Sequence, residues 1–203
     1  MADPVSLHPT ENRGYRELYV TCRALARHWS RLSERIGDPT AVRALEDGVA
    51  AARRLLAELA ELTPQHGLYG RPAAIGLGAG LADLHNVLAD RFFERNQALR
   101  LAVTEVQHLR TLVLYLGAVG ESLGSEPRTR FCRRWAGELE PIERAARDAA
   151  VALAADPDAA VEPLDRSPLG RAAHGVAYAV GSAGEWIDER AARRREAAGG
   201  AQA

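Results

Sequence analysis

The sequence predicts an all-α protein, an antiparallel bundle of five or six long helices with heptad-like apolar seams and one long central helix. Apolar residues recur at alternating spacings of three and four along most of the chain, which is the period of one helix face. Aromatic residues make up only 5%, so helix formers outweigh the residues that sheets use. Glycine and proline fall between the periodic segments, where helices end and begin.

The central helix is predicted over Leu81–Leu116, which contains neither glycine nor proline. An unbroken helix is favoured, and the alternative is a break near Asn96 that folds the stretch into a hairpin. Arg95 is the one gap in the apolar stripe, and its charge is expected to reach water along a buried stem. Residues 112–116 (LVLYL) are apolar on every face, so a buried strand is a second alternative there. The stripe consists of Leu81, Leu84, Leu88, Phe92, Leu99, Val103, Val106, Leu109, Val113 and Leu116.

Two helices are predicted before this stretch, over about 12–36 and 39–62. The first carries a seven-residue apolar repeat and ends at Gly37, as helices often do. Asp38 then offers a capping side chain, and Pro39 suits the first position of the next helix. A connection this short predicts an antiparallel helical hairpin.

The C-terminal part of the chain predicts two further helical segments. Ser125 marks the start of one of them, and Pro141 should kink it or split it in two because proline removes a backbone hydrogen bond. Residues 156–166 are expected to form an acidic linker. Ser167 and the following proline then repeat the cap signal for a last helix, which ends in a run of arginines at 193–195.

Composition excludes several classes of chemistry and partner. The 26 basic and 27 acidic residues leave a formal charge of −1, so no net field attracts nucleic acid or an anionic membrane. Lysine is absent, which excludes a Schiff base, a pyridoxal-phosphate anchor and a Walker A lysine. The two cysteines are too few for a disulfide framework or a four-cysteine zinc site.

The chain is expected to be one cytoplasmic domain. Residues 1–11 are predicted to be a flexible arm, 12–196 a single helical domain and 197–203 a disordered tail. The N-terminal residues lack the basic and apolar regions of a signal peptide. No run of about 18 apolar residues exists, so no helix is expected to span a membrane.

Residues 120–124 match the G-x-S-x-G pattern of a serine nucleophile, and Asp165 and His174 follow in the order of a catalytic triad. That pattern requires a strand before the serine and a helix directly after it. Here a helical stripe precedes Ser122. The interpretation is therefore a glycine-rich helix end, and no catalytic residue is assigned.

Weak candidates for a binding site lie on the predicted helices. Glu105 and His108 form a Glu-x-x-His motif, which is one half of the di-iron signature of helical bundles, but the second copy that such sites need is missing. Asp83 and His85 become further ligands only if the central stretch folds back. His174 and Tyr178 share a polar stripe with Glu185 on the last helix, either lining a pocket or facing water. Glu58-x-x-Glu61 and Glu185-x-x-Asp188 resemble paired acidic motifs that bind magnesium, but helix surfaces produce such pairs freely.

Arginines gather in two places. One cluster consists of Arg128, Arg130, Arg133 and Arg134, and the other spans residues 190–195. Both could contact phosphates, but neither lies in a recognisable helix-turn-helix, so solvated helix ends are the preferred interpretation.

The expected function is a non-catalytic interaction or scaffold protein that self-associates, most simply as a homodimer, and a separate protein partner is possible. No metal, cofactor or membrane is expected, and nucleic acid is not a favoured partner. The first alternative is a helical bundle with a buried small-molecule or metal site near Glu105 and His108. The second is a helical DNA-binding regulator.

Overall fold

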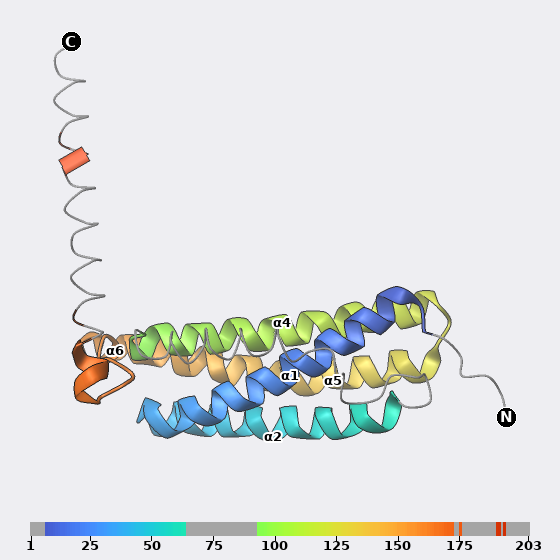
Figure 1. Cartoon of the computed structure of the whole chain (residues 1–203), viewed down its shortest axis with the longest axis horizontal. Coiled ribbons are helices and arrows are strands. Elements are labelled where there is room, and N and C mark those ends of the chain that lie inside the picture. The colour runs from blue at the N-terminus through green and yellow to red at the C-terminus, as the bar shows by residue number, and fades with distance from the viewer. Residues whose placement is uncertain (1–6, 64–92, 173–174, 176–189, 192, 194–203) are drawn as a thin grey trace, which may run out of the picture.

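The computed structural model describes residues 7–63, 93–172, 175, 190, 191 and 193. Four long helices within these residues form an antiparallel bundle, which confirms the predicted all-α class (Figure 1). The helices are α1 (Pro9–Ile36), α2 (Pro39–Leu62), α4 (Arg95–Ser122) and α5 (Glu126–Ala152). Within the described part of the chain, no helix is long and apolar enough to cross a membrane.

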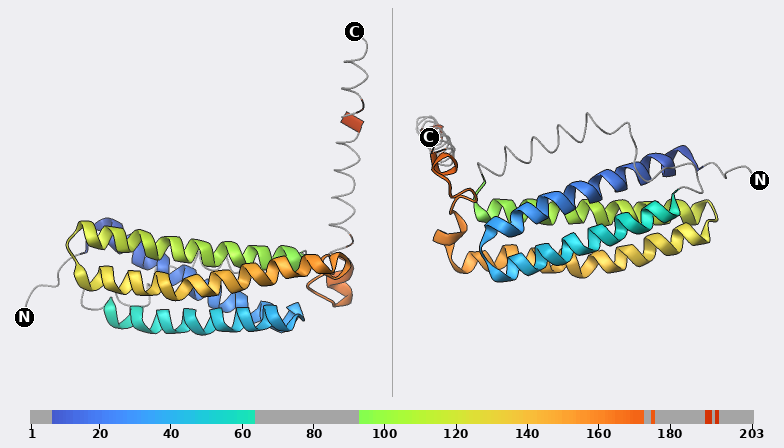
Figure 2. Two further views of the ribbon diagram at one scale, coloured as in Figure 1. Left: turned by 180° about the vertical axis from the view of Figure 1, so that it is seen from behind. Right: turned by 60° about the horizontal axis from the view of Figure 1, so that its bottom comes forward.

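The bundle consists of two helical hairpins laid side by side. α1 packs on α2, and α4 packs on α5. α1 also contacts α4, and α2 contacts α5, so neighbouring helices run antiparallel around the bundle (Figures 1 and 2). α2 ends beside the start of α5, whereas α4 begins at the opposite end of the bundle, beside the end of α1.

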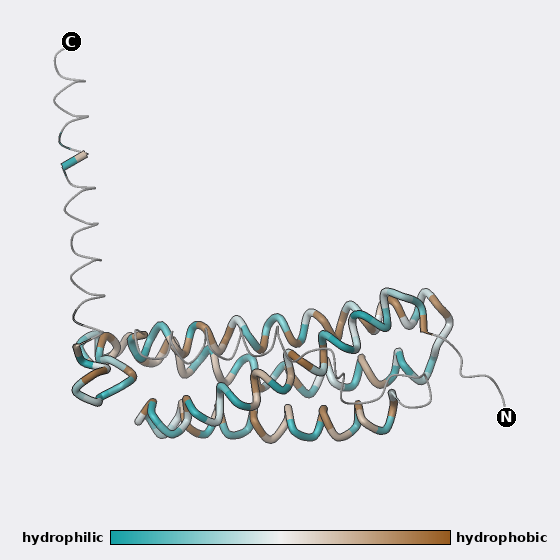
Figure 3. The backbone as a smooth tube through the Cα atoms, in the orientation of Figure 1, coloured by the Kyte–Doolittle hydropathy of each residue, from teal (hydrophilic) through white to brown (hydrophobic). Residues whose placement is uncertain are grey.

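The core is built from the predicted stripes. In α1 the residues that make up the apolar repeat are all buried, and they are Tyr15, Leu18, Cys22, Leu25, Trp29, Leu32 and Ile36. In α5 the ring of Trp135 is fully buried and the stripe continues through Leu139 and Ala146. Apolar and polar residues alternate along every long helix, as the hydropathy colouring in Figure 3 shows. This confirms that the heptad-like seams hold the bundle together.

The turn between α1 and α2 forms as the sequence predicts. Gly37 has a φ of 72°, the left-handed conformation that glycine adopts without steric cost at a helix end. The next residue, Asp38, accepts a hydrogen bond at Oδ1 from the backbone N–H of Ala41 at 2.7 Å, and Pro39 takes the first helical position. The α1–α2 hairpin is therefore confirmed, with α1 ending at Ile36 and α2 spanning Pro39–Leu62 as predicted.

Two expectations about the ends of helices are wrong. α1 begins at Pro9, so residues 9–11 belong to the helix instead of a loose arm, and Glu11 is buried. α4 begins at Arg95, because Phe93 and Glu94 are not helical, so the favoured unbroken helix from Leu81 is wrong at this point. The alternative of a break near Asn96 is confirmed. Residues 81–92, and with them the hairpin part of that alternative, lie outside the described residues.

The start of α4 is fixed by a capping box. The side chain of Glu94 accepts from the backbone of Gln97, whose own side chain accepts from the backbone N–H of Glu94 at 3.3 Å. Glu94 also forms an isolated antiparallel bridge with Pro163. These contacts set the first turn of α4 against the segment that follows α5.

Pro141 does not split α5, which runs unbroken through it. Both Pro141 and Gly137, whose carbonyl loses its hydrogen bond to residue 141, are exposed, so water can satisfy that carbonyl. The expected linker is also partly helical. Asp156 caps a short helix, α6 (Pro157–Ala160), by accepting from the N–H of Ala159 at 3.0 Å.

Residues 112–116 are helical, which excludes the strand alternative for LVLYL. The predicted cap of the last helix also forms, because the N–H of Gly170 donates to Ser167 Oγ at 3.0 Å and residues 168–172 are helical. The body of that last helix falls on residues 173–174 and 176–189, which lie outside the described residues.

Candidate functional site

Glu105 and His108 sit one turn apart on α4 but contact different partners. Glu105 Oε2 lies 2.7 Å from His28 Nδ1 on α1. The His108 side chain is 55% exposed, and its Nε2 lies 3.4 Å from Glu17 Oε1. The two side chains therefore do not converge on one point in this structure.

Glu105 is the acceptor in a buried polar cluster between α1 and α4. Besides the contact with His28, its Oε2 accepts a hydrogen bond from Trp29 Nε1 at 3.0 Å. Both α1 residues are fully buried, and the Glu105 side chain is only 18% exposed. The cluster satisfies an indole N–H that would otherwise lie unpaired in the core.

A second indole–carboxylate pair links α5 to α2. Trp135 Nε1 donates to Glu58 Oε2 at 2.9 Å, and Arg134 donates to both carboxylate oxygens of Glu58. The hydrogen bonds from Arg134 hold the pKa of Glu58 below its usual value. Glu58, a candidate magnesium ligand by its spacing from Glu61, is thus engaged as the partner of an arginine and a tryptophan.

The first turns of α1 and α5 share a third polar cluster. Arg128 Nε donates to Glu11 Oε1 at 2.7 Å, and the Glu11 side chain is only 1% exposed. Nearby, the Tyr15 hydroxyl lies 3.9 Å from Cys132 Sγ. Burial raises the pKa of the Cys132 thiol to about 11 and also raises the pKa of Tyr15. A thiol held protonated in this way is a weak nucleophile.

Ser122 lies in the last turn of α4, in the part of the G-x-S-x-G match that is helical. Its hydroxyl is exposed and donates to the carbonyl of Val119 at 2.8 Å. Gly124 has a φ of 66° and follows the end of the helix. This geometry is that of a glycine-rich helix end, which is the interpretation that the sequence favours.

The arginines at the start of α5 each pair with a glutamate. Arg128 contacts Glu11, as above, and Arg130 contacts Glu126 at 3.0 Å within α5. The other two reach neighbouring helices, where Arg133 pairs with a glutamate of α4 and Arg134 with one of α2. The cluster therefore carries its charge in ion pairs, which also join α5 to the other three long helices.

Several candidates from the sequence cannot be placed. His174 and Tyr178, together with Asp83, His85 and Glu185, lie outside the described residues. Among the residues that are described, no three His, Cys, Asp or Glu side chains gather closely enough to hold a metal ion.

The apolar period of the helices does not reveal the polar clusters around Trp29 and Trp135. A buried tryptophan needs an acceptor for its indole N–H, which is a usable signal. Nothing in the spacing within one helix, however, says which carboxylate on another helix provides that acceptor.

In its described part, this is an antiparallel helical bundle with polar side chains paired between helices. Comparison with protein-family models, curated proteins and solved structures finds no match for this chain.

Proposed function

We propose that the protein is a non-catalytic helical-bundle interaction protein that self-associates as a homodimer through α4. The observation that carries this proposal is a pair of adjacent apolar residues, Leu114 and Tyr115. Each is 50% exposed, although both lie within a long helix of the bundle, in the last third of α4.

Leu114 and Tyr115 belong to a short apolar run whose other residues are buried. Residues 112–116 are apolar on every face, and the core takes up Leu112, Val113 and Leu116. Leu114 and Tyr115 remain on the outer face. Isolated exposed apolar residues are common on protein surfaces, but a contiguous patch is a more specific sign of an interaction surface.

The neighbourhood of the patch suits helix-to-helix contact. Ala118 is exposed one turn further along α4, and its small side chain allows a second helix to approach closely. Burying the exposed half of each large side chain contributes about 1 kcal/mol. In a twofold dimer the same patch is used by both copies, so each of these contributions counts twice.

The polar contacts give less support to the two alternative functions, which are a buried small-molecule or metal site and a DNA-binding surface. A site at Glu105 and His108 requires both side chains to turn toward one ligand, whereas Glu105 is held by Trp29 and His28 in the core. A DNA-binding surface on the arginines of α5 requires phosphates to displace their glutamate partners.

The experiment is sedimentation or light scattering of the purified protein over a range of concentrations up to high micromolar. We expect a dimer for the wild type and a monomer for Leu114→Glu and Tyr115→Glu. Val151→Glu is the matched control, because Val151 on α5 is 67% exposed and lies outside the patch. A wild type that stays strictly monomeric at high micromolar concentration would contradict the proposal.

A further inference from the structure

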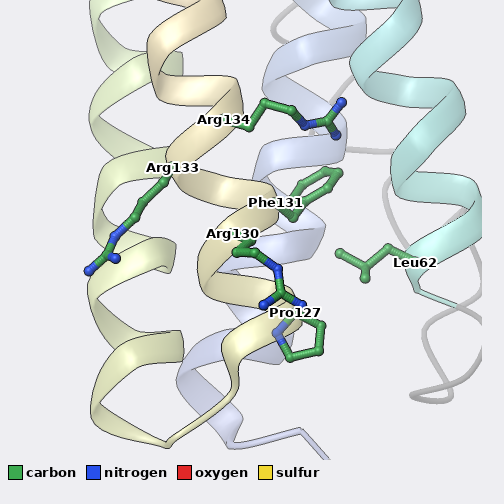
Figure 4. A pocket seen from close by; sticks show the side chains of 6 residues that line it. All are labelled: Leu62, Pro127, Arg130, Phe131, Arg133 and Arg134. Atoms are coloured by element: carbon green, nitrogen blue, oxygen red, sulfur yellow. The ribbon is translucent and has the colours of Figure 1, made fainter.

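An open, mostly apolar depression of about 560 Å³ lies where the end of α2 meets the start of α5. Its volume falls within the range of about 300–1,000 Å³ that is usual for ligand sites. It opens widely to solvent, however, which suits a partner's surface better than an enclosed small molecule. The described side chains that line it are Leu62, Pro127, Arg130, Phe131, Arg133 and Arg134 (Figure 4).

The floor of the depression is apolar and held in place. Leu62 extends from α2 toward the ring of Phe131 and toward Pro127 on α5 (Figure 4). The guanidinium of Arg134 stacks on the Phe131 ring, 5.8 Å from its centroid, and is itself fixed by Glu58. A bulky apolar side chain that enters the depression therefore meets a surface that is already formed.

The charged groups that line the depression are arginines, and none of the described lining residues is acidic. Arg130 and Arg134 stand one helical turn apart on either side of Phe131, with side chains 67% and 51% exposed. Among the described residues Arg130 pairs with Glu126 on its own helix, and such exposed pairs are weak enough for an incoming carboxylate to compete. Arg133 extends instead toward α4, where it pairs with Glu121 (Figure 4).

We propose that this depression is the docking site for an acidic peptide segment of a partner protein, which inserts one bulky apolar side chain between Arg130 and Arg134. An acidic residue beside that anchor competes with Glu126 for the Arg130 guanidinium, which is well shaped for a carboxylate, whereas Arg134 keeps its pair with Glu58 and forms one wall of the depression. A nucleic acid would use the charges but leave the apolar floor empty, so the combination favours a peptide. The site is separate from the α4 patch and does not depend on self-association.

The test uses the full-length protein and a fluorescein-labelled peptide with a central leucine between glutamates, followed by fluorescence anisotropy at two salt concentrations. We expect saturable binding that weakens as salt rises. Arg130→Glu should weaken it by about tenfold or more, as expected for loss of a charge-assisted contact and gain of a repulsion. Arg144→Glu is the matched control, since Arg144 is 66% exposed and pairs with Glu140 four residues away on the same helix.

The peptide has its own control, in which serine replaces the leucine and the charges remain. Circular dichroism melts establish that both arginine variants fold. The proposal is supported if binding requires both the leucine and Arg130. It is overturned if the peptide fails to saturate, if the serine peptide binds equally well, or if Arg144→Glu weakens binding as much as Arg130→Glu. Binding of phosphatidylglycerol vesicles that depends on Arg130, without peptide binding, would overturn it in favour of a membrane surface.

Discussion

Arg95 Nε donates a hydrogen bond to the backbone carbonyl of Ile36 at 2.9 Å, which joins the first residue of α4 to the last residue of α1. The same guanidinium donates from Nη1 to the carbonyl of Ala159 in α6 at 3.4 Å. The backbone N–H of Arg95 donates to Glu162 at 3.0 Å. One residue thus ties three segments together at this end of the bundle, and only 9% of its surface is exposed.

Replacing Arg95 should therefore destabilise the bundle. Arg95→Leu keeps the apolar stem but leaves the Ile36 carbonyl without its charged donor. We expect the free energy of unfolding to fall by about 2–3 kcal/mol, since hydrogen bonds to charged groups contribute about 1.5–3 kcal/mol. Urea unfolding measures this change. The exposed Arg100, on the same helix, provides the control Arg100→Leu, for which a change below about 0.5 kcal/mol is expected.

The two indole–carboxylate pairs predict that Glu105→Ala destabilises the protein more than Glu58→Ala does. Glu105→Ala leaves Trp29 Nε1 without its acceptor in the core and removes the contact with His28, so a loss of about 2–4 kcal/mol is expected. Glu58 is 34% exposed, and water can reach the groups it leaves, so Glu58→Ala should cost less. Chemical unfolding of both variants tests the order. A larger loss for Glu58→Ala would contradict the role assigned to burial.

The seams and the first hairpin could be predicted from the sequence because each depends on local information. The apolar period of α1 needs only residues three and four apart, and the turn needs only Gly37, Asp38 and Pro39. The same Asp-Pro signal occurs at Asp156, where the acidic, proline-containing composition indicated a linker and the structure has a capped helix. The linker prediction was wrong because the capping signal of Asp156 and Pro157 outweighs the acidic, proline-containing composition.

Contacts between distant residues could not be predicted. The apolar stripe continues across Arg95 in the sequence, so we expected an unbroken helix with the Arg95 guanidinium in water. The structure instead starts α4 there and satisfies the charge with the carbonyl of Ile36, 59 positions away. The partners of Glu105 could not be predicted for the same reason. Periodicity shows which face of a helix is buried, but not which polar group of another helix contacts that face.

The buried thiols predict a loss of stability at alkaline pH. Burial raises the pKa of Cys22 to about 12 and that of Cys132 to about 11, against about 8.5 for a thiol in an unfolded chain. Between about pH 8.5 and 11 the unfolded state therefore binds fewer protons than the native state, so the free energy of unfolding falls as pH rises. The slope is at most about 1.4 kcal/mol per pH unit for each thiol.

Unfolding in urea at pH 8, 9 and 10 measures this slope. We expect a shallower slope for the double variant Cys22→Ala and Cys132→Ala, whatever its stability at neutral pH. A thiol reagent at pH 8 should react with the wild type only after denaturation. Equal slopes for wild type and double variant would show that other groups cause any alkaline loss.

Replacing a glycine by alanine should change the free energy of unfolding in opposite directions at two positions inside long helices, Gly48 and Gly137. A Cβ at Gly48 would overlap the ring of Trp29, which is fully buried between α1 and its neighbours and cannot move aside without disturbing the core. Gly48→Ala should therefore lower the free energy of unfolding by about 1–3 kcal/mol or more. A Cβ at Gly137 on α5 meets nothing within 4 Å, so Gly137→Ala should raise it by about 0.5–1 kcal/mol through helix propensity alone. Thermal and urea unfolding of the two variants side by side measure both signs, and stabilisation by Gly48→Ala would mean that α1 and α2 lie further apart than described.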